Sequence, residues 1–581
     1  MNGRPVVLSS KRENPCDDRM VFMAQIFLEG KRGRLHLSSL LTSLRLFRGK
    51  KALEQRMRLI ESALGIADFV VRDAAIKDAF AQYFKSGRPA KETAAVSFLA
   101  VTGRYPSLAE LDPVTRLLTW GRPGEALDFL LRQRKRGHQH IHLEVSKEIE
   151  WGVSQLAKSS AHSGIPRLTR ELAGDAHRAD EGLAVWSAGY LGRAAFDDEK
   201  KRVVLSSRYW RIGPGALIGS LFESWFRHHA FQALGLSVAL SRFFQLGIPL
   251  ARMIWRQLGD SARPRKVLLL KEVTWFQAEV PKAEESDRLA LWSEVVESVS
   301  IDVLIHDWLP ITHPHFFGSE QGADHIGLLG LAEKSRRVVV GSDWLKNQTQ
   351  NILKALGKAT PSIVVAEFPD LLTRGQAQLD EPLEGTPYIL FIGGFESRKG
   401  LSDLLPKISH FLESNRMKLV VVGTPNPLRR GELDLYRYAK SLRKWVTCLT
   451  SVNDDKLDQL YLGARFCIYV SEAEGFGLPL VEAANRKKLI VTRPIEPFMS
   501  LSKQMAAVRP VWKQGMSEFE VAETLAELDL AVAAAPQSTT SIESWKESIH
   551  PSNVLFDRSE GDSPQIIAQR RESMSKRANG R

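Results

Sequence analysis

The C-terminal half of the chain alternates short apolar runs with amphipathic segments. Apolar runs of four or five residues, rich in β-branched side chains, are typical of strands buried on both faces of a parallel sheet. The segments between them have helical spacing, so the pattern predicts a doubly wound α/β domain. The runs are YILFI, KLVVV, VTCL, FCIYV and KLIVT at residues 388–392, 418–422, 446–449, 466–470 and 488–492.

A second alternation lies upstream. Helical segments fit between its candidate strands, including one that starts after Ser163 and another after Ser342. Two consecutive α/β domains would leave a cleft between two sets of strand carboxyl ends, where such sheets bind ligands. The candidate strands are 140–145, 182–188, 202–207, 266–272, 301–307, 336–342 and 362–367.

The two ends of the chain lack this alternation. The beginning is mostly helix-forming, and the polar end is expected to be partly disordered. The predicted fold class is α/β, with two doubly wound, Rossmann-like domains facing a cleft and an N-terminal, mostly helical extension. The predicted units are the extension at 1–138, the two α/β domains at 139–368 and 369–535, and a C-terminal segment at 536–581.

Composition indicates a compartment. The 581 residues carry a net charge of +13 and include three cysteines, whose spacing fits neither a disulfide framework nor a metal site. The N-terminal segment lacks the apolar stretch of a signal peptide, and no run of about 20 apolar residues suggests a transmembrane helix. These features predict a cytoplasmic protein.

The positive charge is concentrated near the N-terminus. Residues 1–60 contain 13 Lys and Arg against 5 Asp and Glu, and residues 31–51 place apolar positions at helical spacing among cations. This pattern suits the anionic inner face of a membrane, or equally a helix packed on its own domain. The aromatic segment 221–255 could dock at a membrane interface or form a buried helix pair. Nucleic acid is not an expected partner, because no binding motif accompanies the charge.

The most specific motif is SEAEGFGLPLVEA at residues 471–483, between a predicted strand and a helix. Gly475 and Gly477 allow a ligand to approach the backbone, and the helix N-terminus offers unpaired N–H donors. Glu474 on the loop and Glu482 in the helix are placed to face one cleft. The alternative interpretation is an ordinary turn with two solvated glutamates.

A second motif, FIGGFESRKGLSDLL, ends a strand at Gly393 and Gly394 and places Arg398 and Lys399 just before a helix. Two cations are unfavourable at a helix N-terminus unless an anion binds there. A diphosphate would fit, because a guanidinium fork and an ammonium group both bind phosphate oxygens. The alternative, a pair of solvated surface cations, is weakened because both motifs follow strands of one sheet.

Together the motifs resemble the retaining GT-B glycosyltransferases of family 4, also called group 1. The C-terminal similarity rests on GGFESRKG, on VVG at 421–423 and on the run 453–483. The resemblance covers about residues 140–535. Upstream, three segments resemble those of bacterial mannosyltransferase-like members: SGIPRLTRELA at 163–173, IHDWLPITHPHFF at 305–317 and VVVGSDW at 338–344.

The resemblance implies roles for the matching residues. Glu482 would bind the ribose of a nucleotide-sugar donor, and Glu474 would lie against the transferred sugar. Arg398 and Lys399 would neutralise the donor diphosphate. The other implied donor-binding positions are Gly393, Gly394, Gly475, Phe476, Gly477 and Leu478, and the acceptor-side positions are Gly164, Arg167 and Asp307.

Some positions depart from the family pattern. The arginine that some members carry after the strand-end glycine is Gly394 here, and the Asp that opens the first strand is matched to Glu144. His306 and His315 stand where the family has a Tyr and a Glu. These departures concern the acceptor side more than the donor site.

Asp307 and His313 follow a predicted strand on the cleft side and are candidate bases for the acceptor hydroxyl. Alternatively, Asp307 caps the next segment and His313 packs against Pro314. No Asp-x-Asp motif suggests a metal site, and NDDK at 453–456 is interpreted as a helix N-cap with an acidic first turn.

The resemblance predicts a retaining, metal-independent hexosyltransferase that needs no cofactor and uses a nucleotide-diphosphate sugar, with GDP-mannose as the first choice of donor. Arg398 and Lys399 would stabilise the diphosphate as it leaves an oxocarbenium-like sugar. The expected acceptor is a surface-polysaccharide or lipid-linked glycan. Two alternatives stay open: another sugar-nucleotide enzyme of this fold, such as an epimerase or phosphorylase, and a catalytically silent binding module.

Overall fold

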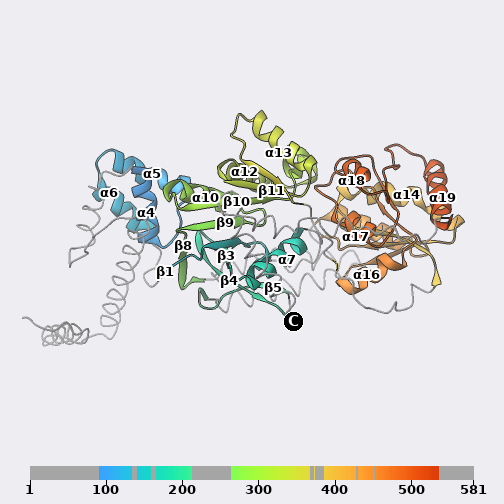
Figure 1. The fold of residues 1–581 in the computed structure, drawn as a ribbon, viewed down its shortest axis with the longest axis horizontal. Coiled ribbons are helices and arrows are strands. Elements are labelled where there is room, and N and C mark those ends of the chain that lie inside the picture. The colour runs from blue at the N-terminus through green and yellow to red at the C-terminus, as the bar shows by residue number, and fades with distance from the viewer. Residues whose placement is uncertain are drawn as a thin grey trace, which may run out of the picture.

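Two α/β sheets lie along the length of the molecule, with a group of helices at the end of the first (Figure 1). This arrangement confirms the predicted fold class. The basic segment 31–51, the aromatic segment 221–255 and the C-terminal segment 536–581 lie outside the described residues. A computed structural model describes residues 90–133, 141–158, 165–199, 201–211, 263–366, 372, 385–426, 429–450 and 452–534.

The described part of the N-terminal extension is helical, as predicted. It contains α4 (Ala90–Thr102), α5 (Leu108–Thr119) and α6 (Pro123–Gln133). Ser107 begins α5 with a capping box, in which Ser107 and Glu110 each bond the other's backbone N–H. Almost all of α4 is buried, so this helix is the centre of the extension.

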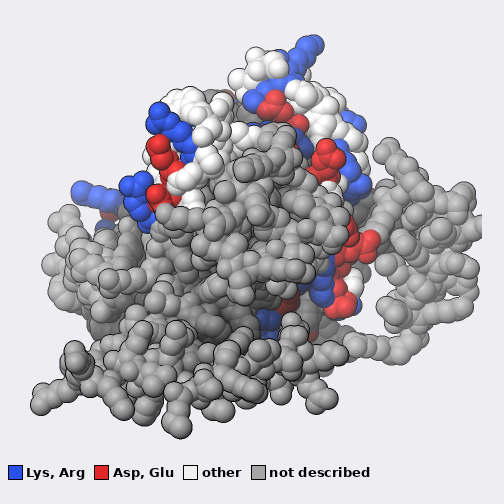
Figure 2. Space-filling model, turned by 90° about the vertical axis from the view of Figure 1, so that its left-hand side faces the viewer, with Lys and Arg blue, Asp and Glu red and all other residues white. Residues whose placement is uncertain are grey.

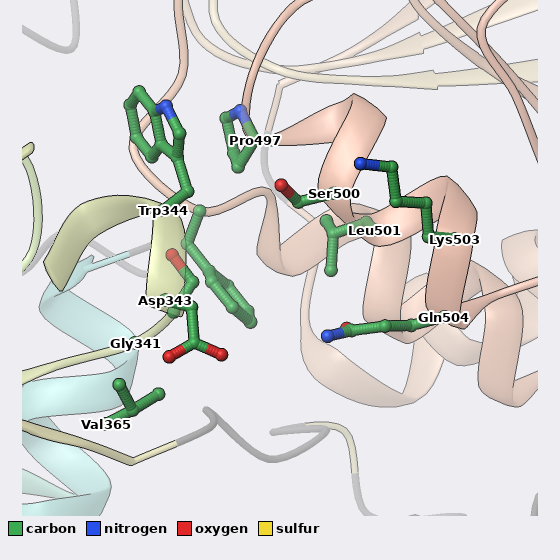
Figure 3. Close-up of a pocket in the computed structure, with 11 residues that line it drawn as sticks. Gly341, Asp343, Trp344, Val365, Pro497, Ser500, Leu501, Lys503 and Gln504 are labelled. Atoms are coloured by element: carbon green, nitrogen blue, oxygen red, sulfur yellow. The ribbon is translucent and has the colours of Figure 1, made fainter. Parts of the chain in front are cut away.

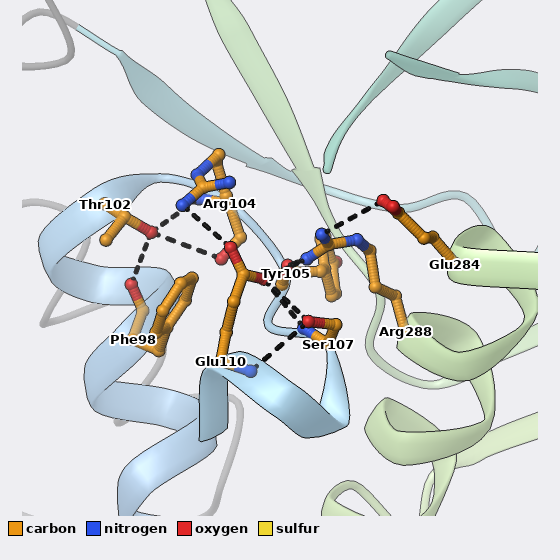
Figure 4. A network of polar contacts seen from close by, with 8 residues as sticks. All are labelled: Phe98, Thr102, Arg104, Tyr105, Ser107, Glu110, Glu284 and Arg288. Atoms are coloured by element: carbon orange, nitrogen blue, oxygen red, sulfur yellow. Dashed lines mark hydrogen bonds and ion pairs between the residues drawn. The ribbon is translucent and has the colours of Figure 1, made fainter. Parts of the chain in front are cut away.

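A polar network joins the extension to the first α/β domain (Figure 4). Arg288, on α10 (Ala283–Val295), is buried and donates to the carbonyl of Tyr105 and to Glu110 Oε2, the latter at 2.7 Å. Glu110 also pairs with Arg104 at 3.0 Å, and the exposed Glu284 lies 3.7 Å from Arg288. The Tyr105 hydroxyl donates to the carbonyl of Leu268, which ties the extension to the strands as well.

The first large sheet has eight strands in the order β12-β11-β10-β9-β2-β3-β4-β5. Its strands from β12 to β3 are parallel, and β4 and β5 add an antiparallel edge. The strands are β2 (Ile149–Gly152), β3 (Gly182–Ser187), β4 (Tyr190–Asp197), β5 (Arg202–Leu205), β9 (Val273–Gln277), β10 (Val299–Ile305), β11 (Arg337–Val340) and β12 (Ser362–Val365). The helical elements are η2 (Leu156–Lys158), α7 (Ile165–Arg178), α11 (Leu309–Thr312), η3 (Pro314–Phe316), α12 (Ser319–Lys334) and α13 (Asp343–Ala355).

The structure corrects the start of this domain. The predicted strand at 140–145 exists as β1 (His142–Val145), but it pairs with β8 (Lys266–Leu269) in a separate two-stranded sheet. The strand of the large sheet that precedes α7 is β2, so matching Glu144 to the start of the family's first strand was wrong. A further small sheet joins β6 (Trp210–Arg211) to β7 (Arg263–Pro264).

Strands β2, β4 and β9 were not predicted. In β2 a buried charge obscures the apolar pattern: Glu150 is fully buried and pairs with Arg193 at 2.9 Å. Burial raises the pKa of Glu150 although Arg193 opposes the shift. Strand β9 follows β8 after Glu272, which has a φ of 48°, and the predicted run ended at residue 272, just before β9 begins.

The second large sheet is parallel throughout and has the order β15-β14-β13-β16-β17-β18, which is the 3-2-1-4-5-6 order of dinucleotide-binding folds. All five predicted strands are present, and β18 was not predicted. Asn453 caps α16 by accepting from the N–H of Lys456 at 2.9 Å, which confirms the N-cap interpretation of NDDK. The strands are β13 (Tyr388–Ile392), β14 (Lys418–Val422), β15 (Val446–Leu449), β16 (Phe466–Tyr469), β17 (Ile490–Thr492) and β18 (Val508–Arg509). The helical elements are η5 (Ser397–Lys399), α14 (Leu401–Ser414), α15 (Arg430–Ser441), α16 (Asp454–Gly463), α17 (Leu478–Asn485), α18 (Phe498–Gln504) and α19 (Glu518–Ala534).

The two α/β domains share buried apolar surface. One hydrophobic cluster runs from Leu168 on α7 and Phe276 on β9 to Leu390 on β13 and Tyr461 on α16. At the end that carries α4–α6, the described basic and acidic side chains are interspersed (Figure 2). In the described ranges, no helix is long and apolar enough to cross a membrane.

Candidate active site

The two motif loops meet at the carboxyl edge of the second sheet. Strands β13 and β16 are neighbours, so the loops that follow them lie together. Gly400 has a φ of 73°, and a side chain there would lie 2.1 Å from the carbonyl oxygen of Val470. The loops also share a backbone hydrogen bond of 2.7 Å, from the N–H of Glu472 to the carbonyl of Arg398. Glycine at position 400 therefore allows the close contact that brings the two motifs together.

Glu474 bridges the two cations of the other loop. Lys399 Nζ lies 2.6 Å from Glu474 Oε1, and an Arg398 guanidinium nitrogen lies 3.1 Å from Oε2. Ser471 Oγ donates to Oε1 at 2.7 Å, and Glu396 accepts from Arg398 Nε at 2.7 Å. Three motif residues predicted separately thus form one cluster of charged side chains.

Burial makes these charges interact strongly. The side chains of Arg398 and Lys399 are each 16% exposed, and that of Glu474 is 12% exposed. Burial alone would raise the pKa of Glu474, but Lys399 and Arg398 lower it to about 2. Burial would lower the pKa of Arg398, but the carboxylates of Glu474, Glu396 and Asp307 raise it. At neutral pH Glu474 is therefore ionised, and the cations Arg398 and Lys399 face two carboxylates, Glu474 and Glu396.

The glycine-rich loop leads into α17 without a capping side chain. Gly477 precedes Leu478 with a φ of 99°, a conformation that favours glycine, and Pro479 occupies the first turn as predicted. No side chain caps this helix. Pro479 has no N–H and the N–H of Leu480 donates to the carbonyl of Gly477 at 2.9 Å, so the N–H of Leu478 is the candidate donor in the first turn. Phe476, by contrast, is buried and 7% exposed.

Gly475 packs directly against the first α/β domain. A Cβ at this position would lie 2.6 Å from Asp307 Cβ and 2.7 Å from the carbonyl oxygen of His306. Asp307 Oδ1 also accepts from the N–H of Leu309 at 2.9 Å, and lies 3.9 Å from His325 Nε2. Asp307 therefore caps the next segment, as one interpretation predicted. It also borders the glycine-rich loop, as its candidate role as a base requires.

His313 lies apart from this cluster. Its Nδ1 is 2.9 Å from Thr312 Oγ1, and its ring stacks on Phe316 at 6.4 Å between centroids. None of its contacts among the described residues joins it to Glu474. The structure thus brings only one of the two candidate bases to the site.

Glu482 is buried at the boundary between the domains. It accepts from the hydroxyl of Tyr461 at 2.9 Å and forms an ion pair with Arg167 of α7. Arg167 also lies 3.6 Å from Asp454, and both Glu482 and Arg167 are almost completely buried. Sequence reasoning placed Arg167 on the acceptor side and did not anticipate that it pairs with the predicted ribose ligand.

The strand-end glycines explain the VVG motif at 421–423. The N–H of Gly393 donates to the carbonyl of Val422 at 2.9 Å. A Cβ on Gly423 would lie 1.9 Å from the carbonyl oxygen of Gly393, so this position has no room for a side chain. Gly394 lies next, with Glu396 Oε1 3.4 Å from where its Cβ would be. Gly164 lies outside the described residues.

A cavity of 210 Å³ opens beside the glycine-rich loop, between the two domains (Figure 3). Asp343 and Trp344 come from the start of α13, and Ser500, Lys503 and Gln504 come from α18. Asp343 and Trp344 belong to the VVVGSDW segment but were not assigned to the site, and no motif marks the three residues of α18. The remaining lining residues are Gly341, Ser342, Val365, Phe476, Pro497 and Leu501.

Residues 377–507 match the family model for group 1 glycosyl transferases. The matched range contains the second sheet up to β17 and every residue of the charged cluster. The match places the second α/β domain among the group 1 glycosyl transferases. The first α/β domain and the helical extension lie outside the match.

Several relatives of this chain are mannosyltransferases by name. The serotype-specific mannosyltransferase WbdA of Escherichia coli is 27% identical over 226 residues, which cover 35% of this chain and 27% of WbdA. The GDP-mannose:cellobiosyl-diphosphopolyprenol alpha-mannosyltransferase of Xanthomonas oryzae pv. oryzae is 26% identical over 117 residues, or 20% of this chain and 31% of that enzyme. The chain thus spans about a quarter to a third of the length of these relatives.

Among solved structures, the trehalose-6-phosphate synthase OtsA is 12% identical with a TM-score of 0.41, covering 67% of this chain and 92% of the synthase. The sucrose-phosphate synthase of Thermosynechococcus elongatus is 13% identical with a TM-score of 0.39, covering 66% of this chain and 90% of that one.

Proposed function

We propose that this glycosyltransferase moves a hexose from a nucleotide-diphosphate sugar to a glycan acceptor, with retention of the anomeric configuration. The observation that carries the proposal is the buried cluster of Arg398, Lys399 and Glu474 at the carboxyl edge of a parallel sheet. This edge is where doubly wound sheets bind nucleotides. Two cations beside the start of a helix that no side chain caps match a diphosphate.

The cluster fits the charge changes of sugar transfer. As the bond to the leaving diphosphate breaks, negative charge grows on the phosphate oxygen and positive charge grows on the sugar ring. Arg398 and Lys399 would stabilise the first charge, and the ionised carboxylate of Glu474 would stabilise the second. We also propose that these two cations neutralise the leaving group without a metal ion, so that transfer persists in excess EDTA.

The other residues would complete the site. Glu482 would bind the ribose hydroxyls, the N–H groups at Phe476, Gly477 and Leu478 would bind the donor, and Asp307 would accept a proton from the acceptor. Asp307 suits this role because it contacts the donor loop at Gly475. His313 is not part of the proposed site.

The names of the relatives support mannose as the sugar and GDP as its carrier, since two are mannosyltransferases and one uses GDP-mannose by name. The acceptor that we propose is a surface-polysaccharide or lipid-linked glycan, reached from the cytoplasmic side of the membrane. Association with an anionic membrane is proposed for residues 1–60. Deleting them is expected to release the protein from vesicles that contain anionic lipid and to leave GDP-mannose binding unchanged.

Substitutions in the cluster test the reaction. Lys399→Ala and Glu474→Ala are each expected to lower transfer of mannose from GDP-mannose at least about a hundredfold, because each removes charge that stabilises the transition state. Circular dichroism verifies that the variants stay folded. Lys407→Ala, which breaks the ion pair with Asp403 on α14, is the control and should keep full activity. Full activity in either cluster variant would contradict the assignment.

Two alternative functions, an epimerase and a silent binding module, would give different results in activity assays. An epimerase would convert the donor when no acceptor is present, whereas a transferase would leave it largely intact. A silent binding module would transfer no sugar to any acceptor. The wild type and Lys399→Ala would then both form no product.

A further inference from the structure

We infer that the glycan acceptor binds as a chain of neutral sugars, with one ring in the cavity between α13 and α18 and the following rings along α13. This inference rests on the proposed function for the identity of the acceptor as a glycan. The residues assigned to the track are Trp344, Asn347, Gln348 and Asn351, together with Asp343 and Gln504 in the cavity.

The cavity lies where an acceptor must lie. It shares Phe476 with the glycine-rich donor loop. Its other wall follows β11, whose Val340 pairs with Ile305 of β10, the strand that leads to Asp307. The cavity is therefore one strand away from the candidate base and in contact with the loop that would hold the donor sugar.

The side chains in the cavity suit a sugar. Trp344 offers a flat apolar face, and Asp343, Lys503 and Gln504 offer charged and amide groups on two sides (Figure 3). Among the residues that the structure describes, none of these three polar side chains has a hydrogen-bonding or ionic partner. A ligand with an apolar ring face and several hydroxyl groups would satisfy both kinds of surface.

A second hollow, of 450 Å³, continues from the other side of Trp344. Its described lining is one face of α13: Trp344, Asn347, Gln348, Asn351, Ile352 and Ala355. These positions recur at the three- and four-residue spacing of a helix face and extend about 16 Å along the axis, which is longer than one monosaccharide ring. The hollow therefore has room for more than one sugar.

The chemistry of this second hollow selects a neutral ligand. No residue in its described lining carries a charge, so it offers nothing to a phosphate or a nucleotide. Its amides from Asn347, Gln348 and Asn351 have no partner among the described residues and can both donate to and accept from hydroxyl groups. Because Trp344 lines both spaces, the two can hold parts of one molecule.

Titration of the full chain with mannose and with α-mannosides of two, three and four residues tests the track. Affinity is expected to rise with the number of sugars. Trp344→Ala should weaken every mannoside about tenfold, because the aromatic face contacts the ring in the cavity. Asn351→Ala should leave mannose binding unchanged and remove most of the gain from the longer chains.

Gln350→Ala is the matched control, since this amide lies on α13 outside both linings. Equal affinity for all chain lengths, no binding of any mannoside, or equal effects of Asn351→Ala and Gln350→Ala would overturn the inference. A parallel titration with GDP-mannose separates the two proposals. Loss of donor binding with intact length dependence would contradict the proposed reaction and leave the saccharide track standing.

Discussion

Glu474 has the most constrained environment of the proposed catalytic residues. It is held by two cations and a serine hydroxyl, and each of its carboxylate oxygens has at least one partner. Such a carboxylate keeps one orientation and stays ionised, as a group that faces a developing positive charge must. The cost is that folding depends on its charge.

The pH dependence of stability should report that charge. The folded-state pKa of Glu474, about 2, lies below its ordinary value of 4.5. The ionised carboxylate therefore contributes fully to the free energy of unfolding above pH 4.5. This contribution is lost as the pH falls toward 2. Glu474→Gln should lower the free energy of unfolding by about 3–5 kcal/mol near neutral pH, because it removes the carboxylate that pairs with Lys399 and with Arg398, which then retains Glu396. Urea denaturation at a series of pH values measures the difference between the two proteins, which should shrink in acid. A difference independent of pH would contradict the role of the ionised carboxylate.

Arg167 competes with the ribose for Glu482 if the proposed donor site is right. Arg167→Ala should then tighten GDP binding and lower the free energy of unfolding by about 3–5 kcal/mol, because Glu482 loses its buried partner. Isothermal titration with GDP measures the first effect. Arg178→Ala on the same helix is the control, since its pair with Asp175 is largely exposed. Weaker GDP binding in Arg167→Ala would mean that Arg167 itself binds the nucleotide.

Individual contacts of the site differ in how far the sequence predicts them. The meeting of Arg398, Lys399 and Glu474 follows from strand order, because both motifs come after neighbouring parallel strands. The pair of Arg167 with Glu482 depends on how two domains face each other, which local patterns do not encode. Trp344 ends the VVVGSDW segment but no role follows from it there, Gln504 carries no motif, and the cavity brings the two together.

The elements show a similar contrast. Strands with both faces buried, such as β13 and β14, were predicted because nearly all their residues are apolar. Strand β2 was missed because Glu150 is buried in it with Arg193 as its partner. Strand β4 was missed because five of its eight residues are only partly buried and its buried residues do not alternate with exposed ones.

The joint between the helical extension and α10 depends on one carboxylate. Glu110 caps α5, pairs with Arg104 and accepts from the buried Arg288. Glu110→Ala should lower the free energy of unfolding by about 2 kcal/mol, since hydrogen bonds to charged groups are lost together with the cap. Glu284→Ala removes the exposed carboxylate that lies near Arg288. It should change the free energy of unfolding by less than about 0.5 kcal/mol. Equal effects in chemical denaturation would contradict the importance of the buried contact.

At the scale of the whole molecule, the proposed site is built from two domains. The second supplies the charged cluster and Glu482, and the first supplies Asp307, Arg167 and the start of α13. A shared apolar cluster holds the domains together beside these polar contacts. The site therefore requires that both domains keep their present relation when the substrates react, and the donor half alone should bind a nucleotide without transferring its sugar.

Titration of the full chain with GDP-mannose, and in parallel with UDP- and ADP-sugars, tests the central claim most directly. The account predicts saturable binding of a nucleotide sugar, weakened at least tenfold in Lys399→Ala and unchanged in Lys407→Ala. Absence of binding by every nucleotide sugar in folded protein, or equal binding by Lys399→Ala and the wild type, would contradict it.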